Sequence, residues 1–261
     1  MQGGVTGVTG LARRAARGWR RLAMLGLAAV ALLVASGVTL GASTQGTDGP
    51  DRLDGTPQGD TISGGAGDDT IKGEAGNDVL DGDADSDTID GGPGNDSVYG
   101  ARCEAGTVGR FCDNPGNEVL RGGSGNDTVL ANRCVIDTCV HDRFIALDSV
   151  LDGGPGQDLV VGADGNDTIS GGTGDDILRG RDGNDRVSGN DGNDTIYGED
   201  GNDRLYGGRG KDRIFGGRGR DRISARDDTR DRIDCGPGRD VAVVDAHDTV
   251  RNCEKVERQR G

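Results

Sequence analysis

The sequence predicts an all-β solenoid, in which short parallel strands and tight turns repeat along one axis. A nine-residue unit recurs in one frame from Gly46 to Ser224, with two interruptions. Each unit carries an aliphatic residue at its eighth position and is rich in glycine over its first four positions. A fixed short period of this kind indicates a structure in which each unit packs only against its neighbours.

Composition alone would place the chain among disordered proteins. It contains 51 glycines and 45 acidic residues among 261, with only 3% aromatic residues. Such a chain has too little apolar surface to offset the loss of backbone entropy. The regular period overrides this interpretation. The formal net charge of -15 argues against a nucleic acid partner.

Residues 1–43 are predicted to be a targeting segment. A basic stretch, Arg13 to Arg21, precedes the almost wholly apolar residues Leu22 to Leu40, and small residues follow. This order favours a cleaved signal peptide, although the 19 apolar residues also reach the minimum length of a membrane anchor. In both alternatives the repeats lie outside the cell, because the basic flank stays in the cytoplasm. We therefore expect a secreted or cell-surface protein, with membrane contact only if the segment is uncleaved.

The sixth position of the unit is acidic throughout. Sixteen units share the frame: six from Gly46 to Tyr99, two from Asp113 to Leu130 and eight from Gly153 to Ser224. Glu118 takes the sixth position in one unit. An acidic face that was only solvated would not keep one spacing. In the other units the sixth residue is Asp51, Asp60, Asp69, Asp78, Asp87, Asp96, Asp127, Asp158, Asp167, Asp176, Asp185, Asp194, Asp203, Asp212 and Asp221.

The eighth position is the regular apolar position. Residues seven to nine are expected to form a short strand whose middle side chain points inward while its neighbours point outward. The predicted core is therefore one aliphatic residue thick in each unit. These residues are Leu53, Ile62, Ile71, Leu80, Ile89, Val98, Leu120, Val129, Val160, Ile169, Leu178, Val187, Ile196, Leu205, Ile214 and Ile223.

The first five positions predict a turn. Glycines at positions one, two and four suit a backbone that needs positive φ and close approach. Asn is frequent at position five, as in Asn77 and Asn95. We interpret this Asn mainly as a residue that tolerates the same backbone geometry, with direct binding of a ligand as the alternative.

The thin core predicts that a metal is needed for folding. One aliphatic side chain per unit does not offset the entropy of ordering the chain, and acidic side chains stacked at each turn repel one another. The metal-free chain is therefore expected to be unfolded. A hard divalent cation held by Asp carboxylates and turn carbonyls would supply folding free energy. Oxygen-only ligands favour calcium over zinc or copper, so we expect multiple calcium ions.

These units resemble the RTX, or hemolysin-type, calcium-binding nonapeptide repeat, over about Gly46 to Val243. The resemblance implies a right-handed parallel β-roll in which two units make one turn. It also implies that the first six positions form a calcium loop and that each ion sits between loops of successive turns. Carried over by position, it makes the fifteen Asp residues at position six the calcium ligands.

Some units depart from the family pattern, and calcium is expected to bind most weakly there. Glu118 replaces the ligand Asp, and Gln58 and Asp85 replace the glycine of position four. Basic residues enter the two loops of Gly207 to Ser224. They are Arg209, Lys211, Arg218 and Arg220.

Two insertions of thirteen residues, 100–112 and 131–143, interrupt the repeat. They lie 31 residues apart, which is one insertion plus two units. Because two units make one turn, both insertions should leave the same edge in adjacent turns and stack on each other. Residues 44–234 are thus predicted to form the roll. Residues 235–261 are predicted to cap it, because a solenoid must cover its last apolar layer.

Six cysteines in an exported chain predict three disulfides. Cys235 and Cys253 bracket the C-terminal segment and are expected to bridge. Within the insertions, the simplest pairing joins Cys103 to Cys112 and Cys134 to Cys139. A cross-link between Cys103 and Cys134 is the main alternative, and a zinc site that includes His141 is less favoured.

The sequence contains no motif that indicates catalysis. The exported part has only two histidines, His141 and His247, and neither a G-x-S-x-G nor an H-E-x-x-H pattern. We therefore expect no enzyme. The favoured hypothesis is an exported calcium-binding protein that folds when it meets calcium outside the cell.

The sequence is also compatible with functions other than calcium-dependent folding alone. The main alternative is a surface adhesion or matrix protein, stiffened by calcium, whose stacked insertions bind an extracellular protein or glycan. A non-catalytic accessory module of a secreted enzyme or toxin is a minor alternative. Ice binding is set aside, because it would need regular threonines at position three and, among the in-phase units, Thr173 alone supplies one.

Overall fold

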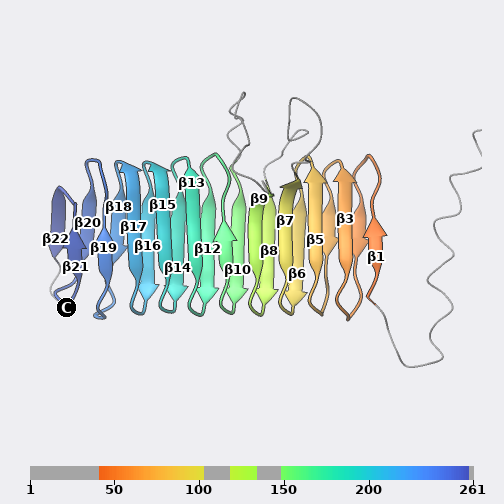
Figure 1. Ribbon diagram of the computed structural model, residues 1–261, viewed down its shortest axis with the longest axis horizontal. Helices are drawn as coiled ribbons and strands as arrows, with labels where there is room; N and C mark the ends of the chain where they lie inside the picture. Colours follow the sequence, from red (N-terminus) through yellow and green to blue (C-terminus); the bar gives the residue numbers. More distant parts are fainter. Residues whose placement is uncertain (1–40, 103–117, 134–147, 259–261) are drawn as a thin grey trace, which may run out of the picture. The chain divides into compact units, whose positions relative to one another are not determined.

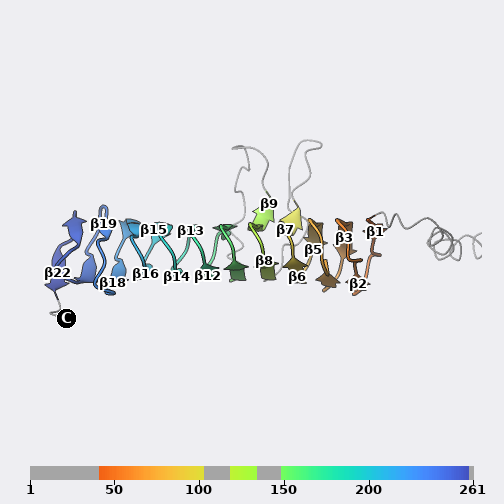
Figure 2. The ribbon, with the colours of Figure 1, turned by 90° about the horizontal axis from the view of Figure 1, so that it is seen from below.

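The computed structural model describes residues 41–102, 118–133 and 148–258. Within these ranges the chain forms two sheets of 11 strands each. The odd-numbered strands make one sheet and the even-numbered strands make the other, so the chain crosses between the sheets at each loop (Figures 1 and 2). Across the same ranges, no helix is long and apolar enough to span a membrane. The predicted targeting segment lies almost wholly outside the described residues.

We call the two layers the odd sheet and the even sheet. The odd sheet consists of β1 Ser43–Gln45, β3 Thr61–Ala66, β5 Val79–Ala84, β7 Ser97–Arg102, β9 Thr128–Arg133, β11 Leu159–Val161, β13 Ile177–Asp182, β15 Thr195–Gly201, β17 Arg213–Gly219, β19 Arg232–Asp234 and β21 Thr249–Arg251. The even sheet consists of β2 Arg52–Asp54, β4 Thr70–Lys72, β6 Thr88–Pro93, β8 Val119–Ser124, β10 Val150–Pro155, β12 Thr168–Thr173, β14 Arg186–Asp191, β16 Arg204–Arg209, β18 Arg222–Ala225, β20 Val241–Val244 and β22 Lys255–Arg258.

The strands pair in parallel, with a register of two units per turn. Leu178 on β13 lies opposite Ile196 on β15, 18 residues later in the sequence. Across the first insertion the spacing grows, and Val98 on β7 lies opposite Val129 on β9. The predicted parallel β-solenoid with two nonapeptides per turn is therefore confirmed.

The core consists of two facing rows of mainly aliphatic side chains, one from each sheet. Leu178 is fully buried, whereas Ile177, its neighbour on the same strand, is 45% exposed. This alternation is what the period of two in a strand dictates. The eighth-position residues predicted from the sequence all lie in this core, with Leu53 of the first layer only partly buried.

Both insertions begin on neighbouring strands of the odd sheet. Residues 100–102 of the first insertion end β7, and residues 131–133 of the second end β9. These two strands pair directly, with Tyr99 opposite Leu130. Their points of departure are therefore at one edge in adjacent turns, as predicted (Figure 1). The cysteines of the insertions, Cys103, Cys112, Cys134 and Cys139, lie outside the described residues, and their pairing stays a prediction.

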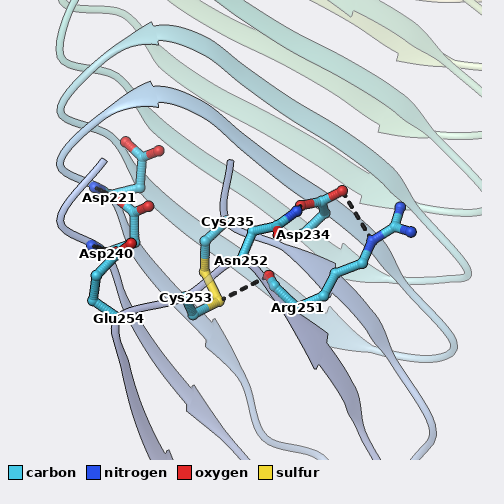
Figure 3. Close-up of a disulfide and its surroundings, with 8 residues drawn as sticks. All are labelled: Asp221, Asp234, Cys235, Asp240, Arg251, Asn252, Cys253 and Glu254. Atoms are coloured by element: carbon cyan, nitrogen blue, oxygen red, sulfur yellow. Dashed lines mark hydrogen bonds and ion pairs between the residues drawn. A yellow bond between two sulfur atoms is a disulfide. The ribbon is translucent and has the colours of Figure 1, made fainter. Parts of the chain in front are cut away.

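The C-terminal segment continues both sheets. β20 pairs with β18 and β22, and β21 pairs with β19, all in parallel. A disulfide joins Cys235 to Cys253 across this last part of the roll, as expected (Figure 3). Val256 on β22 is 41% exposed. The capping role assigned to residues 235–261 stays a prediction.

Candidate metal sites

The sixth-position residues form two rows, one along each edge of the solenoid, because each precedes a strand and strands stack in register. The odd row precedes strands of the odd sheet and consists of Asp60, Asp78, Asp96, Asp127, Asp158, Asp176, Asp194, Asp212, Asp231 and Asp248. The even row precedes strands of the even sheet and consists of Asp51, Asp69, Asp87, Glu118, Ser149, Asp167, Asp185, Asp203, Asp221, Asp240 and Glu254.

Each carboxylate supports the turn before it through one oxygen. The backbone N–H of Asp158 donates to Oδ1 of Asp176 over 2.9 Å, and the N–H of Asp185 donates to Oδ1 of Asp203 over 2.9 Å. The same bond recurs along both rows. These hydrogen bonds hold the carboxylates inside the loops. Asp185 and Asp194, for example, are fully buried.

The second carboxylate oxygen is what distinguishes these side chains. In fourteen Asp residues of the described part of the chain, Oδ2 is buried and accepts no hydrogen bond. Buried polar atoms are normally paired, so a repeated orphan oxygen points to a missing ligand. These residues are Asp69, Asp78, Asp87, Asp96, Asp127, Asp158, Asp176, Asp185, Asp194, Asp203, Asp212, Asp221, Asp231 and Asp240.

The first-position glycine makes room for this oxygen. A Cβ added to Gly180 would lie 2.2 Å from Oδ2 of Asp185 and 2.7 Å from the carbonyl oxygen of Gly198 in the next turn. The φ of Gly180 is not positive, whereas Gly172 and Gly174, at positions two and four, have φ of +116° and +127°. The expectation of positive φ therefore holds at positions two and four and is wrong at position one, where close approach is the reason for glycine.

The fifth-position asparagines form a ladder of their own. The backbone N–H of Asn184 donates to Oδ1 of Asn166 over 2.9 Å, and that of Asn202 donates to Oδ1 of Asn184 over 3.0 Å. None of these three residues has positive φ. The interpretation of Asn as a residue that tolerates positive φ is therefore wrong. Its amide oxygen instead accepts a backbone N–H from the next turn. One unit of the repeat does not reveal this bond, because its two partners lie 18 residues apart.

Burial raises the pKa values of the row carboxylates. The pKa of Asp185 rises to about 7, mainly because burial removes water from its carboxylate and further because Asp203 and Asp167 carry like charge. The pKa of Asp176 rises to about 7 through burial and the charge of Asp158. A carboxylate in this state is stabilised by a nearby positive charge.

The residues present fit calcium. Within the described ranges, no group of three or more His, Cys, Asp or Glu side chains gathers to hold an ion. An ion here would be held by the Oδ2 of a row Asp together with backbone carbonyls, such as that of Gly198, which faces the position-one glycine of the previous turn. Calcium takes six to eight oxygen ligands, and these commonly include backbone carbonyls.

The loop of Asp85 and the two loops with basic residues keep the common arrangement. Asp85 adopts the positive φ of the glycine that it replaces, at 76°. Arg209 and Arg218 point outward, with ion pairs to Asp191 at 3.5 Å and to Asp200 at 3.3 Å. Oδ2 of Asp212 and of Asp221 is unpaired, as in other units. Weaker calcium binding at these loops stays a prediction.

Three predicted ligands differ from the rest. Oδ2 of Asp51, Asp60 and Asp167 accepts a backbone N–H from the second position of its own loop, at 2.6, 2.5 and 2.8 Å respectively. Sequence reasoning also missed row members outside the sixteen units. Ser149 belongs to the even row, and its signal was its place 18 residues before Asp167. Asp231 and Asp240 extend the rows beyond Ser224.

Comparison with known proteins agrees with this geometry. The RTX calcium-binding nonapeptide repeat (4 copies) matches residues 45–80, 72–102, 114–133, 152–187, 188–223 and 210–242. No curated protein matches the chain. Among solved structures, a hyperactive, Ca²⁺-dependent, β-helical antifreeze protein from an Antarctic bacterium is similar, with 24% identity over 78% of this chain and 68% of that one and a TM-score of 0.48.

The family match stands on its own, since it spans well over half of the chain and the matched units contain the buried carboxylates described above. The chain therefore belongs to the RTX calcium-binding nonapeptide repeat family and binds multiple calcium ions.

Proposed function

We propose that this chain is an exported protein whose solenoid folds around calcium ions held along its two edges. One observation carries the proposal. Fourteen buried Asp residues each give one oxygen to the fold and keep the other unpaired, as set out above. The proposed ligands are these fourteen oxygens, together with loop carbonyls.

Calcium would decide whether the fold is stable. Taking a carboxylate out of water without a partner costs on the order of several kcal/mol, and each row repeats this cost at every turn. The raised pKa of Asp203, to about 7, is the same penalty expressed as a proton affinity. A divalent cation beside Oδ2 reverses the sign of the interaction, and its binding free energy becomes folding free energy.

The proposed function requires that the protein is exported from the cell. Extracellular calcium modules bind with dissociation constants of roughly 0.1 to 1 mM, which is far above cytosolic calcium. The basic and apolar residues of 1–43 supply a route across the membrane. The chain would stay unfolded inside the cell and fold outside. We propose no catalytic role.

The test is a calcium titration of the full-length protein followed by far-ultraviolet circular dichroism, with magnesium as the control. We expect a cooperative change from disorder to strand with calcium and none with magnesium, because Mg²⁺ demands strict octahedral geometry and gives up its water reluctantly. At pH 8, where the row carboxylates are ionised in the absence of metal, a strand signal that persists in calcium-free buffer would overturn metal-driven folding. It would leave a scaffold held by disulfides.

A second candidate function is adhesion through the insertions. It is supported by the departure of both insertions from the paired strands β7 and β9, at one edge of the roll. Two segments that start side by side would form one composite surface for an extracellular protein or glycan. Deleting residues 103–111 and 134–142 should abolish binding to a glycan or cell-surface array and preserve calcium-dependent folding. Binding that survives the deletion would exclude this candidate.

A further inference from the structure

In the nine-residue units, the backbone at position two divides the loops into two kinds. In the first kind, which we call open, position two has positive φ and Oδ2 of the row Asp is unpaired, as at Gly172 with Asp176. In the second kind, which we call closed, position two does not have positive φ and its N–H donates to Oδ2. The closed loops are those of Thr47 with Asp51, Thr56 with Asp60 and Ala163 with Asp167.

Two of these closed loops lie at an end of the solenoid. Asp51 lies between β1 and β2, and Asp60 lies between β2 and β3, at the N-terminal end of the described roll. At the other end, Asp248 is also satisfied, because the N–H of Asp245 donates to its Oδ2 over 2.9 Å. Asp167 is different, since it lies in the interior with Asp185 following it in the same row.

Ala163 explains the closed loop at Asp167. A Cβ on the open-loop residue Gly172, at φ +116°, would lie 1.9 Å from the carbonyl oxygen of Gly154. Open loops with a side chain at position two stand at φ of 72–79° instead, as Glu74 and Arg181 do. That left-handed region is unfavourable for a residue with a Cβ. Position four of the same loop, Gly165, keeps the usual positive φ of +146°. The backbone of this loop therefore differs from that of the open loops at position two.

The preceding member of the even row is also unusual. Ser149 donates its N–H to Oδ1 of Asp167 over 2.7 Å, and it has no carboxylate. Ser149 lies in the connection from β9 to β10, which also contains the second insertion. On the opposite edge at this level, Asp158 and Asp176 are both open. Two consecutive positions of the even row therefore lack a free carboxylate oxygen, and the odd row beside them is complete.

We propose that calcium is missing from the even row at Ser149 and Asp167, beside the second insertion, while calcium lines the odd row without a gap from Asp78 to Asp231. In the gap, the N–H of Ala163 takes the place of the cation on Asp167. The turn after the second insertion is thus held at one edge by a hydrogen bond that needs no metal. This inference rests on the proposed function and refines which carboxylates perform it.

The test compares two neighbours in one row. Calcium bound per chain is measured by elemental analysis after equilibrium dialysis of full-length wild-type, Asp167→Asn and Asp185→Asn proteins. We expect Asp185→Asn to lose about one ion and Asp167→Asn to lose none. Ala163→Gly should gain about one ion, because glycine is free to adopt the open backbone, and Ala163→Gly with Asp167→Asn should lose that gain. Ala66→Gly, at position three, is the control and should change nothing.

Loss of an ion in Asp167→Asn, or no gain in Ala163→Gly, would overturn the gap and leave calcium binding intact. A wild-type protein that retains no calcium would instead refute the proposed function, and the gap with it. A further measurement needs no variant. In the calcium-saturated wild-type protein, nuclear magnetic resonance should give a weak intraresidue amide-to-Hα contact for Ala163. A strong contact, the mark of positive φ, would overturn the inference.

Discussion

The backbone N–H of Asp176 donates to Oδ1 of Asp194 over 2.9 Å, so that the side chain of one turn closes the backbone of the turn before it. Oδ2 of the same Asp194 is buried and unpaired. One carboxylate therefore has two separable tasks: its first oxygen joins turns, and its second is the proposed calcium ligand.

Substitutions at Asp194 should separate these tasks. Asp194→Asn keeps an oxygen for the N–H of Asp176 and removes the charge, so we expect the loss of about one calcium ion with modest destabilisation. Asp194→Ala also leaves that buried N–H unpaired, which costs a further 1–3 kcal/mol or so. Calcium counts and urea unfolding at fixed calcium measure the two effects. Equal stability of the two variants would contradict a structural role for Oδ1.

The metal-free chain should respond to pH in the opposite sense to an ordinary acidic protein. The pKa values of Asp87 and Asp212 are raised to about 7 in the folded state, chiefly by burial. Between about pH 4, the unfolded value, and pH 7 the folded state binds more protons, so its stability is greatest at low pH and falls as pH rises. Circular dichroism in calcium-free buffer should show more strand at pH 5 than at pH 8.

With calcium present the pH dependence should reverse. Protons compete with the ion for Oδ2, so the calcium concentration needed for folding should increase as pH falls below 7. A titration at several pH values measures this. A midpoint that does not change between pH 8 and pH 5 would show that buried carboxylates with raised pKa values are not the ligands.

The core should be sensitive at the eighth position and tolerant beside it. Leu178 is fully buried and Ile177 is 45% exposed on the same strand. Leu178→Ala should cost about 2–5 kcal/mol, because it removes buried surface and leaves a cavity. Ile177→Ala is the matched control and should have a small effect. Urea unfolding at saturating calcium compares them, and similar losses would argue against a core one residue thick.

The position-one glycine should be essential for metal binding. A Cβ on Gly180 would lie 2.2 Å from Oδ2 of Asp185, so Gly180→Ala should displace that oxygen and remove about one calcium ion. Gly49→Ala is the control, because a Cβ there has no heavy atom within 4 Å. The number of calcium ions bound per chain is measured for the two variants. An unchanged number in Gly180→Ala would refute the proposed position of the ion beside Asp185.

The C-terminal disulfide should protect the last turns locally. Cys235 and Cys253 close an 18-residue segment, and loops of this size contribute roughly 3 kcal/mol. In the variant with both residues changed to Ser, hydrogen exchange should accelerate in β19–β22. It should stay unchanged in β12–β14, because a solenoid couples mainly neighbouring turns. Acceleration along the whole roll would contradict this local role.

The amino-acid pattern was sufficient to predict the nine-residue period, the core of one aliphatic residue per unit and the stacking of acidic side chains. These features repeat at fixed spacing, and a strand alternation or a stacked row follows from spacing alone. Leu178 is identified as a core residue and Asp185 as a row member without any coordinates, and both lie where the pattern places them. The common departure edge of the two insertions follows from the same counting.

The use of each carboxylate oxygen became visible in the folded chain and could not be read from the repeat. The partners of a row carboxylate come from another turn, 18 residues away, or from a backbone angle that the pattern does not specify. Gly180 is small because Asp185 approaches it, and Asn166 caps the next turn instead of bending its own loop. Asp167 matches the motif as well as Asp185 does, yet the N–H of Ala163 satisfies it. A one-dimensional repeat identifies which residues stack, whereas hydrogen bonding between turns decides which of them remain free for an ion.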